Sequence, residues 1–184
     1  MRIVVGITGA TGAIYGITLL EYLRSHGVET HLILSNWGKC TIELETNQTI
    51  DKVTKLATCT YREDDQAAPV SSGSFIHHGM VVVPCSMKTL SAVAHGYADN
   101  LISRAADVTI KERRKLILVT RESPLSAIHL ENMLKLARLG VTIMPPMPAF
   151  YQKPQTIEDI VQHSTGRILD HLGVEHCMIK RWGE

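Results

Sequence analysis

Short apolar runs alternate along this 184-residue chain with segments in which apolar residues recur at helical spacing. This alternation is typical of strand–helix–strand units, in which a parallel sheet carries helices on both faces. We therefore expect an α/β fold: a single Rossmann-like or flavodoxin-like three-layer αβα domain with a mainly parallel sheet, spanning residues 1–184. The predicted strands are Ile3–Thr8, Thr30–Ser35, Met80–Pro84, Lys115–Thr120 and a short one at Val141–Met144.

The predicted helices lie between these strands and end where glycine or polar residues break the apolar period. Residues 46–78 are less regular, and the segment MPPMPAFYQKP (144–154) cannot form regular structure, because its four prolines interrupt any ladder. The helices expected are Ala13–Ser25, Trp37–Glu45, Asp51–Ala57, Ser86–Ala94, Asn100–Glu112, Ser126–Leu139 and Thr156–Leu172.

Composition excludes several classes of function. The formal net charge is +1, so no basic field points to nucleic acid or to an anionic membrane surface. The N-terminal apolar run is interrupted by Gly6, Gly9 and Gly12 and is too short to span a bilayer. The four cysteines show no metal-binding spacing, and we expect reduced thiols, a cytoplasmic location and no metal site.

A turn rich in glycine and alanine follows the first strand, in the sequence ITGATGAIYG. Such a turn exposes backbone N–H groups at the positive end of a helix and suits a phosphate. The dinucleotide spacing G-x-G-x-x-G is absent, no acid follows the second strand, and no tyrosine has a lysine four residues on. Because these three features of dehydrogenases are missing, the sequence excludes a dehydrogenase and favours a cofactor with one phosphate. Thr11 and Ser35 would donate hydrogen bonds to that phosphate. The alternative is a tight turn that binds no ligand.

A second polar turn, PCSMKT, follows the strand Met80–Pro84. In a doubly wound sheet this turn lies beside the first, at the carboxyl edge where ligands bind. Ser86 and Thr89 stand at a helix start, where each can cap the helix or bind a ligand. Lys88 alone would be interpreted as a solvated lysine.

Together the motifs GITGATGAIYG, ELET, SSGSF, PCSMKTLSAVAHGYADNLISRAADVTIKERRKL, RESPLSAIHLENM and PPMPAFYQKPQTIEDIV resemble the UbiX-type flavin prenyltransferases, a family that includes proteins named as subunits of phenolic acid decarboxylases. The resemblance runs from Arg2 to Trp182. It implies a metal-independent enzyme that joins the dimethylallyl group of dimethylallyl monophosphate to N5 and C6 of reduced FMN. It also implies delivery of prenylated FMN to a UbiD-type decarboxylase, and a dodecamer with sites shared between neighbouring subunits.

The resemblance also assigns roles to individual residues. Two family positions differ here: Thr11 replaces a frequent serine and keeps its hydroxyl, and Thr120 replaces a proline. The prenyl phosphate contacts map onto Lys111, Tyr151 and Arg167. The catalytic set comprises Glu45, Arg104, Lys111 and Glu122, and the FMN contacts map onto Gly9, Ala10, Thr11, Ser35, Ser86, Met87, Lys88, Thr89 and Arg121.

Elementary chemistry is compatible with these roles. The C–O bond to a phosphate breaks more readily beside concentrated positive charge, which Lys111, Arg121 and Arg167 can supply without a metal. Glu122 is placed to transfer a proton and Glu45 to orient the cations. Taken alone, Lys111 belongs to the run KERRK, which is typical of a solvated helix end.

The sequence also allows alternative functions. FMN-dependent cysteine decarboxylases share the fold but carry a PASANT turn where this chain has PCSMKT. A non-catalytic FMN-binding accessory subunit of a phenolic acid decarboxylase is the main alternative, and direct decarboxylation by this chain is a third. The sequence leaves open the pathway served, a monophosphate or diphosphate donor, and the roles of His77, His78 and the loop 144–148.

Overall fold

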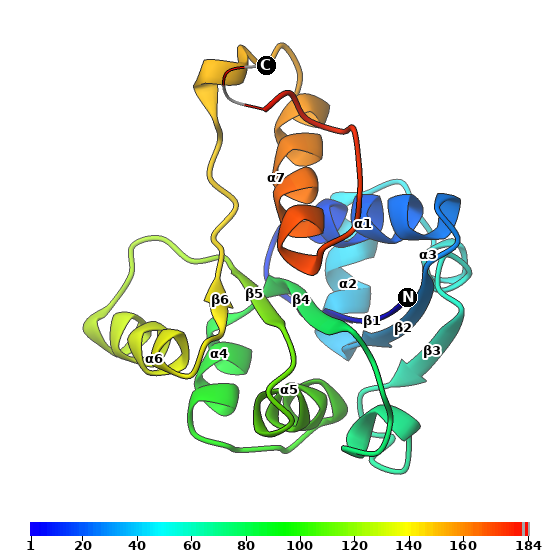
Figure 1. Ribbon diagram of the computed structural model, residues 1–184, viewed down its shortest axis with the longest axis vertical. Coiled ribbons are helices and arrows are strands. Elements are labelled where there is room, and N and C mark those ends of the chain that lie inside the picture. The colour runs from blue at the N-terminus through cyan, green and yellow to red at the C-terminus, as the bar shows by residue number, and fades with distance from the viewer. Residues whose placement is uncertain (182, 184) are drawn as a thin grey trace.

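The computed structural model describes residues 1–181 and 183, and its centre is a six-stranded sheet in which every strand pair is parallel (Figure 1). The strand order is β3-β2-β1-β4-β5-β6, the order of a dinucleotide-binding doubly wound fold. In this order the chain winds one way from β1 to β3 and the other way from β4 to β6. The strands are β1 (Arg2–Ile7), β2 (Glu29–Leu34), β3 (Cys59–Arg62), β4 (Gly79–Cys85), β5 (Leu116–Thr120) and β6 (Thr142–Ile143).

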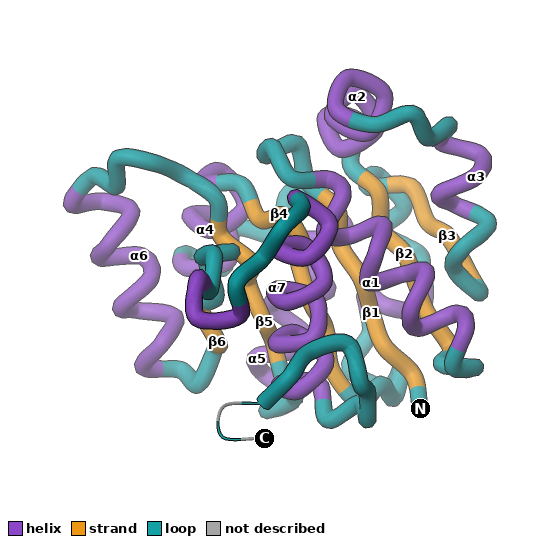
Figure 2. Tube along the Cα trace, turned by 90° about the horizontal axis from the view of Figure 1, so that it is seen from above, coloured by secondary structure: helices purple, strands orange, loops and turns teal. Residues whose placement is uncertain are grey.

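Helices cover both faces of the sheet, as Figure 2 shows from above. Side chains of α1 and α7 pack with alternate residues of β1 and β4 into one hydrophobic core, and those of α4, α5 and α6 pack into a second core on the other face. The helices are α1 (Ala13–Ser25), α2 (Asn36–Glu45), α3 (Ile50–Thr54), α4 (Met87–Ala94), α5 (Leu101–Lys111), α6 (Ala127–Arg138) and α7 (Ile157–Leu172).

The expected three-layer parallel fold is confirmed, with small differences at element ends. The helices predicted to start at Ser86, Asn100, Ser126 and Thr156 start one residue later, because each of these residues is the N-cap and accepts a backbone N–H with its side chain. Asn36 is already helical, and Ser35 caps α2.

Three short elements were not predicted. Strand β3 (Cys59–Arg62) is mostly exposed and pairs only with β2, so its sequence carries no apolar run that would identify it. A 3₁₀ turn forms at Pro69–Ser71, and another at Phe150–Gln152, where the prolines of residues 144–154 exclude longer elements. Within the described residues no helix is long and apolar enough to cross a membrane.

The winding direction reverses between β1 and β4, which lie side by side in register, Val5 opposite Val81. The turns that follow these strands therefore diverge at the same edge of the sheet. A doubly wound sheet places its ligand in the crevice at this point.

Candidate functional site

The turn after β1 and the turn after β4 are joined by the hydroxyl of Thr8. Its Oγ1 donates to the carbonyl of Pro84 at 2.7 Å and accepts from the backbone N–H of Ser86 at 2.9 Å. Thr8 is buried, so water does not replace these bonds. The expected juxtaposition of the glycine turn and the PCSMKT turn is confirmed.

The glycine turn depends on Gly12, which has φ +102° and is the N-cap of α1. The carboxylate of Glu45 accepts from the N–H groups of Gly12 and Ala13, at 2.8 and 3.2 Å. Glu45 thus caps α1 and contacts backbone, whereas the sequence suggested that it orients cations. Gly9, Ala10 and Thr11 remain at least partly exposed in front of this cap.

Ser35 and Ser86 cap the helices that follow β2 and β4. Ser35 Oγ accepts from Gly38 N–H at 2.9 Å, and Ser86 Oγ accepts from Thr89 N–H at 3.3 Å. A hydroxyl that accepts a cap bond keeps its own proton for a second bond, so capping and ligand binding are compatible. Both serines line one cavity of about 250 Å³, together with Thr8, Gly9, Lys88 and Thr89.

The same cavity is also lined by Glu63 and Asn100, which the sequence did not single out, and by Trp37, which it offered as an aromatic face for a cation. Glu63 follows β3 and accepts from Asn36 N–H at 2.9 Å, and Asn100 caps α5. Trp37 lies beside them, 74% exposed. Glu63 was missed because the strand before it, β3, was not predicted. Asn100 was expected at the start of a helix, and the structure places that helix start at this edge of the sheet.

The remaining members of the PCSMKT turn have distinct surroundings. Met87 packs against the core of the α4–α5 face. Lys88 is 80% exposed, and its ammonium lies 3.8 Å from Asp99. The Cys85 thiol is buried, and burial raises its pKa to about 12.

Arg121 and Glu122 follow β5, at the same edge of the sheet. The Arg121 N–H donates to the carbonyl of Cys85 at 3.2 Å, and the Glu122 carboxylate accepts from Ser123 N–H at 3.0 Å. Both side chains are exposed. The Oγ1 of Thr120, before them, is buried and has no hydrogen-bond partner among the described residues.

Tyr151 lies next to His163, which is one helical turn before Arg167 on α7. The Tyr151 hydroxyl and His163 Nε2 are 3.4 Å apart. Burial, and then the charge of Arg167, lower the pKa of His163, which favours the neutral ring. His163 and Arg167 line an apolar cavity of about 200 Å³ formed with Val119, Met144, Pro145, Pro146 and Met147.

Arg104 and Lys111 lie near opposite ends of α5, and each has a partner there. The Arg104 guanidinium donates to the carbonyl of Ser71 and to Asp107, both at 3.1 Å, and Lys111 pairs with Glu112. Helix α5 starts at the cavity edge and runs to the opposite edge, about 15 Å away. Lys111 is therefore remote from Arg121 and Arg167 of the same chain.

The histidine pair at 77–78 has structural partners. His77 Nδ1 is 3.1 Å from the carbonyl of Gly79, and His78 Nδ1 accepts the N–H of Arg2 at 3.0 Å. Among the residues that the structure describes, no group of His, Cys, Asp and Glu could hold a metal ion.

Comparison with known proteins identifies close relatives. The model of the family described as Flavoprotein matches residues 1–169. A probable UbiX-like flavin prenyltransferase of Streptomyces sp. (strain D7) is 58% identical over 183 residues, which cover 99% of this chain and 92% of the relative.

Two solved structures are similar over the whole chain. One, AnUbiX (PadA1) in complex with FMN and dimethylallyl pyrophosphate, is 54% identical with a TM-score of 0.98, covering 100% of this chain and 97% of that one. The other, a dodecameric FMN-dependent UbiX-like decarboxylase from Escherichia coli O157:H7, is 56% identical with a TM-score of 0.98 and covers 100% of both chains.

Proposed function

The chain belongs to the Flavoprotein family and, within it, to the UbiX-like flavin prenyltransferases, and from this membership we propose that it prenylates FMN. As a single domain over residues 1–184, it joins the dimethylallyl group of dimethylallyl monophosphate to N5 and C6 of reduced FMN. The observation that carries the proposal is the match over the whole chain, at 54% identity and a TM-score of 0.98, to a relative in complex with FMN and dimethylallyl pyrophosphate.

The cavity at the switch point suits the flavin. Its hydroxyl donors come from the starts of two helices, Ser35 from α2 and Ser86 and Thr89 from α4, and the exposed Lys88 adds a cation. We assign FMN binding to these residues, with Gly9, Ala10, Thr11, Met87 and Arg121 at its margin. Reduced FMN, when bound, supplies the electron-rich N5 and C6 that the dimethylallyl group is joined to.

The second cavity suits the prenyl donor. Its methionines and prolines offer an apolar wall of the kind a five-carbon chain needs, and Arg167 adds a cation at that wall. In this assignment Arg167 and Tyr151 donate hydrogen bonds to the phosphate, which leaves with the electrons of the broken C–O bond. Glu122, exposed at the end of β5, is assigned the proton transfer: it takes the proton that the flavin ring releases when the new bond forms and delivers it to the departing phosphate.

A second copy of the chain completes this site in our proposal. Lys111 lies at the end of α5 that points away from the cavities, yet concentrated charge at the leaving phosphate requires it nearby. Arg104 lies near the start of the same helix, where it pairs with Asp107. Large apolar side chains are exposed, as expected of a surface that other subunits cover. They include Trp37, Leu44, Met147, Phe150 and Ile157.

The product is delivered, in this proposal, to a UbiD-type decarboxylase, and the assembly is a homo-oligomer of the dodecameric type seen in the E. coli relative. We also propose a cytoplasmic location. It is supported by the four cysteines, which are all free thiols.

An anaerobic assay tests the proposal. Purified protein is mixed with reduced FMN and dimethylallyl monophosphate, and the mass of the released flavin is measured by mass spectrometry. We expect a flavin heavier by one five-carbon unit. Arg167→Met should lose this product, whereas Arg138→Met, a matched loss of an exposed arginine on α6, should retain it.

The accessory-subunit alternative makes the opposite prediction. If FMN binds but returns unchanged with both the monophosphate and the diphosphate donor, the chain is a flavin carrier and the prenyltransferase proposal fails.

A further inference from the structure

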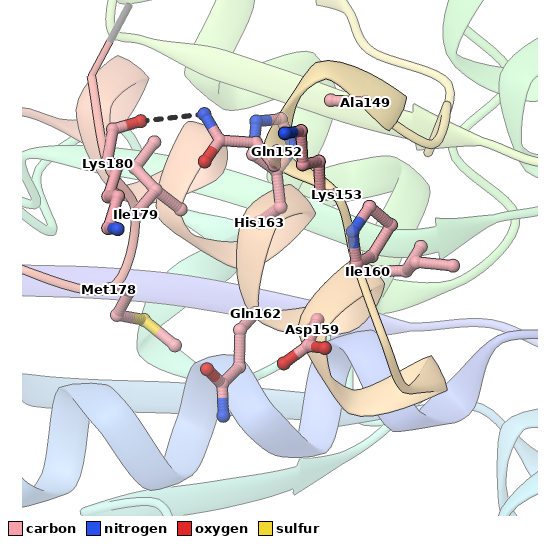
Figure 3. A pocket seen from close by; sticks show the side chains of 11 residues that line it. Ala149, Gln152, Lys153, Asp159, Ile160, Gln162, His163, Met178, Ile179 and Lys180 are labelled. Atoms are coloured by element: carbon pink, nitrogen blue, oxygen red, sulfur yellow. Dashed lines mark hydrogen bonds between the residues drawn. The ribbon is translucent and has the colours of Figure 1, made fainter.

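The chain folds back after α7, and residues 174–181 form a C-terminal arm that lies along this helix (Figure 1). Two contacts fix the arm to distant elements: Gln152 Nε2 donates to the carbonyl of Lys180 at 2.9 Å, and the Tyr22 hydroxyl donates to the carbonyl of Glu175 at 3.2 Å. Figure 3 shows the Gln152–Lys180 bond and the arm residues Met178, Ile179 and Lys180 on one side of a pocket. These residues and His163 of α7 line this pocket, whose volume is about 310 Å³.

The arm fits closely against α7 because residue 166 is glycine. A Cβ added there would lie 2.8 Å from Ile179 Cγ2 and 3.1 Å from His176 Cε1. At these distances a methyl group on residue 166 would push the Ile179 and His176 side chains away from α7, so glycine lets the arm dock this closely.

Asp170 links the arm to the helix. Its side chain is only 17% exposed and faces three basic side chains: Arg167 at 2.8 Å, His176 at 3.0 Å and Arg181 at 2.9 Å. His176 and Arg181 belong to the arm, and both contact Oδ1, whereas Arg167 contacts Oδ2. The carboxylate is thus held on one oxygen by the arm and presents the other to Arg167.

Asp170 also lies where it can direct Arg167. The two residues are one helical turn apart on α7, and the Arg167 side chain is 45% exposed at the rim of the prenyl-donor cavity. The guanidinium donates to Asp170 through Nη1 alone, so its other N–H groups can donate hydrogen bonds to a phosphate. A long side chain that is ordered in advance loses less conformational entropy on binding.

We propose that Asp170, held by the C-terminal arm, is a positioning residue that orients Arg167 toward the phosphate of the prenyl donor. This inference rests on the proposed function. It assigns a role in substrate binding to a residue with no contact to the flavin cavity, and to an arm that lies outside the sheet and its covering helices.

The first test separates binding of the donor from turnover. Asp170→Asn keeps the shape of the side chain but removes its charge, and should raise the KM for dimethylallyl monophosphate about tenfold or more, the size of a lost hydrogen bond between charged groups. The kcat should change less, and the Kd of FMN and the oligomeric state should stay those of the wild type. Glu175→Gln, the same chemical change at an exposed arm residue, is the matched control and should leave KM unchanged.

The second test displaces the arm without touching a charge. Gly166→Ala should raise the same KM, because its methyl group crowds the Ile179 and His176 side chains and shifts the arm, while alanine favours the helix itself. Equal KM values for wild type, Asp170→Asn and Gly166→Ala would overturn the inference, and so would a parallel loss of FMN binding or of assembly. A wild-type chain that makes no prenylated flavin at all overturns the proposed function first, and the inference with it.

Discussion

At the scale of single residues, burial decides which side chains are reactive. Cys85 belongs to the PCSMKT turn, whose position beside the flavin cavity suggests a nucleophile, yet its thiol is fully buried and its pKa is raised to about 12. A thiol with this pKa stays protonated at neutral pH and is a poor nucleophile. The other three cysteines, Cys40, Cys59 and Cys177, are exposed on the protomer.

We therefore predict that Cys85 is protected from alkylation in the folded protein. Treatment with iodoacetamide followed by peptide mass spectrometry should leave Cys85 unmodified, and urea should expose it together with global unfolding. Modification of Cys85 in native protein, as fast as that of the exposed cysteines, would contradict the burial argument.

His77 gives a pH dependence to stability. Burial is the main cause that lowers its pKa, and the bond to Gly79 only partly offsets this. The folded state therefore keeps His77 neutral at a pH where the unfolded chain takes up a proton. As pH falls below about 6.5, the ordinary value, the free energy of unfolding should fall by at most about 1.4 kcal/mol per pH unit from this residue.

The variant His77→Asn tests this prediction, because an amide can keep the donor to Gly79 without titrating. Urea unfolding at pH 7.5 and pH 5.5 should show a smaller pH difference for the variant than for the wild type. An identical difference in both proteins would place the acid sensitivity elsewhere.

At the scale of elements, the site depends on how two strand ends are joined. β1 and β4 are neighbours in the sheet but are separated by more than seventy residues, and the Thr8 hydroxyl is the buried link between their following turns. The Thr8 hydroxyl accepts the backbone N–H of Ser86, and Ser86 in turn caps α4 and lines the cavity. Thr8 therefore stabilises both the helix cap and the cavity wall.

Thr8→Val should weaken that support. The substitution keeps the shape of the side chain but leaves the Ser86 N–H without its acceptor, which costs about 1–3 kcal/mol in a buried place. We expect a lower free energy of unfolding and a higher Kd for FMN, measured by urea denaturation and by flavin fluorescence. Thr8→Ser retains the hydroxyl and should have the free energy of unfolding and the Kd for FMN of the wild type. An unchanged Kd for FMN in Thr8→Val would mean that this turn does not contribute to FMN binding.

At the scale of the whole molecule, charge is divided between the two edges of the sheet. Arg121 and Arg167 lie toward the carboxyl edge, whereas Lys111 lies at the far end of α5, beside the loop that Arg114 holds through the carbonyls of Gly73 and Phe75. In our proposal each chain therefore contributes one half of a phosphate site at each edge of the sheet, and a closed oligomer joins the two halves.

Mixing variants tests this division. Lys111→Ala and Arg167→Ala should each be nearly inactive alone, because each lacks one half of every site. Oligomers assembled from equal amounts of the two chains should regain about a quarter of the wild-type activity, since one site in four then draws both native residues from different chains. Activity no higher than the sum of the separate variants would mean that both residues serve one chain's own site.

Much of this protein was predictable from local sequence signals. Alternating apolar runs and capping residues determined the parallel sheet, the helices and the glycine turn at the carboxyl edge, because these depend on neighbours a few residues apart. The sequence motifs also predicted the family. β3 escaped prediction because an exposed edge strand buries too little to leave a pattern.

Only the tertiary structure decided which partners the charged groups take. Glu45 caps α1, Asp170 joins Arg167 to the C-terminal arm, and Lys111 ends up at the opposite edge from Arg167. None of these pairings follows from spacing, since each depends on where separate segments pack on the sheet. Short-range periodicity therefore specified the scaffold, and long-range packing specified the chemistry that the scaffold holds.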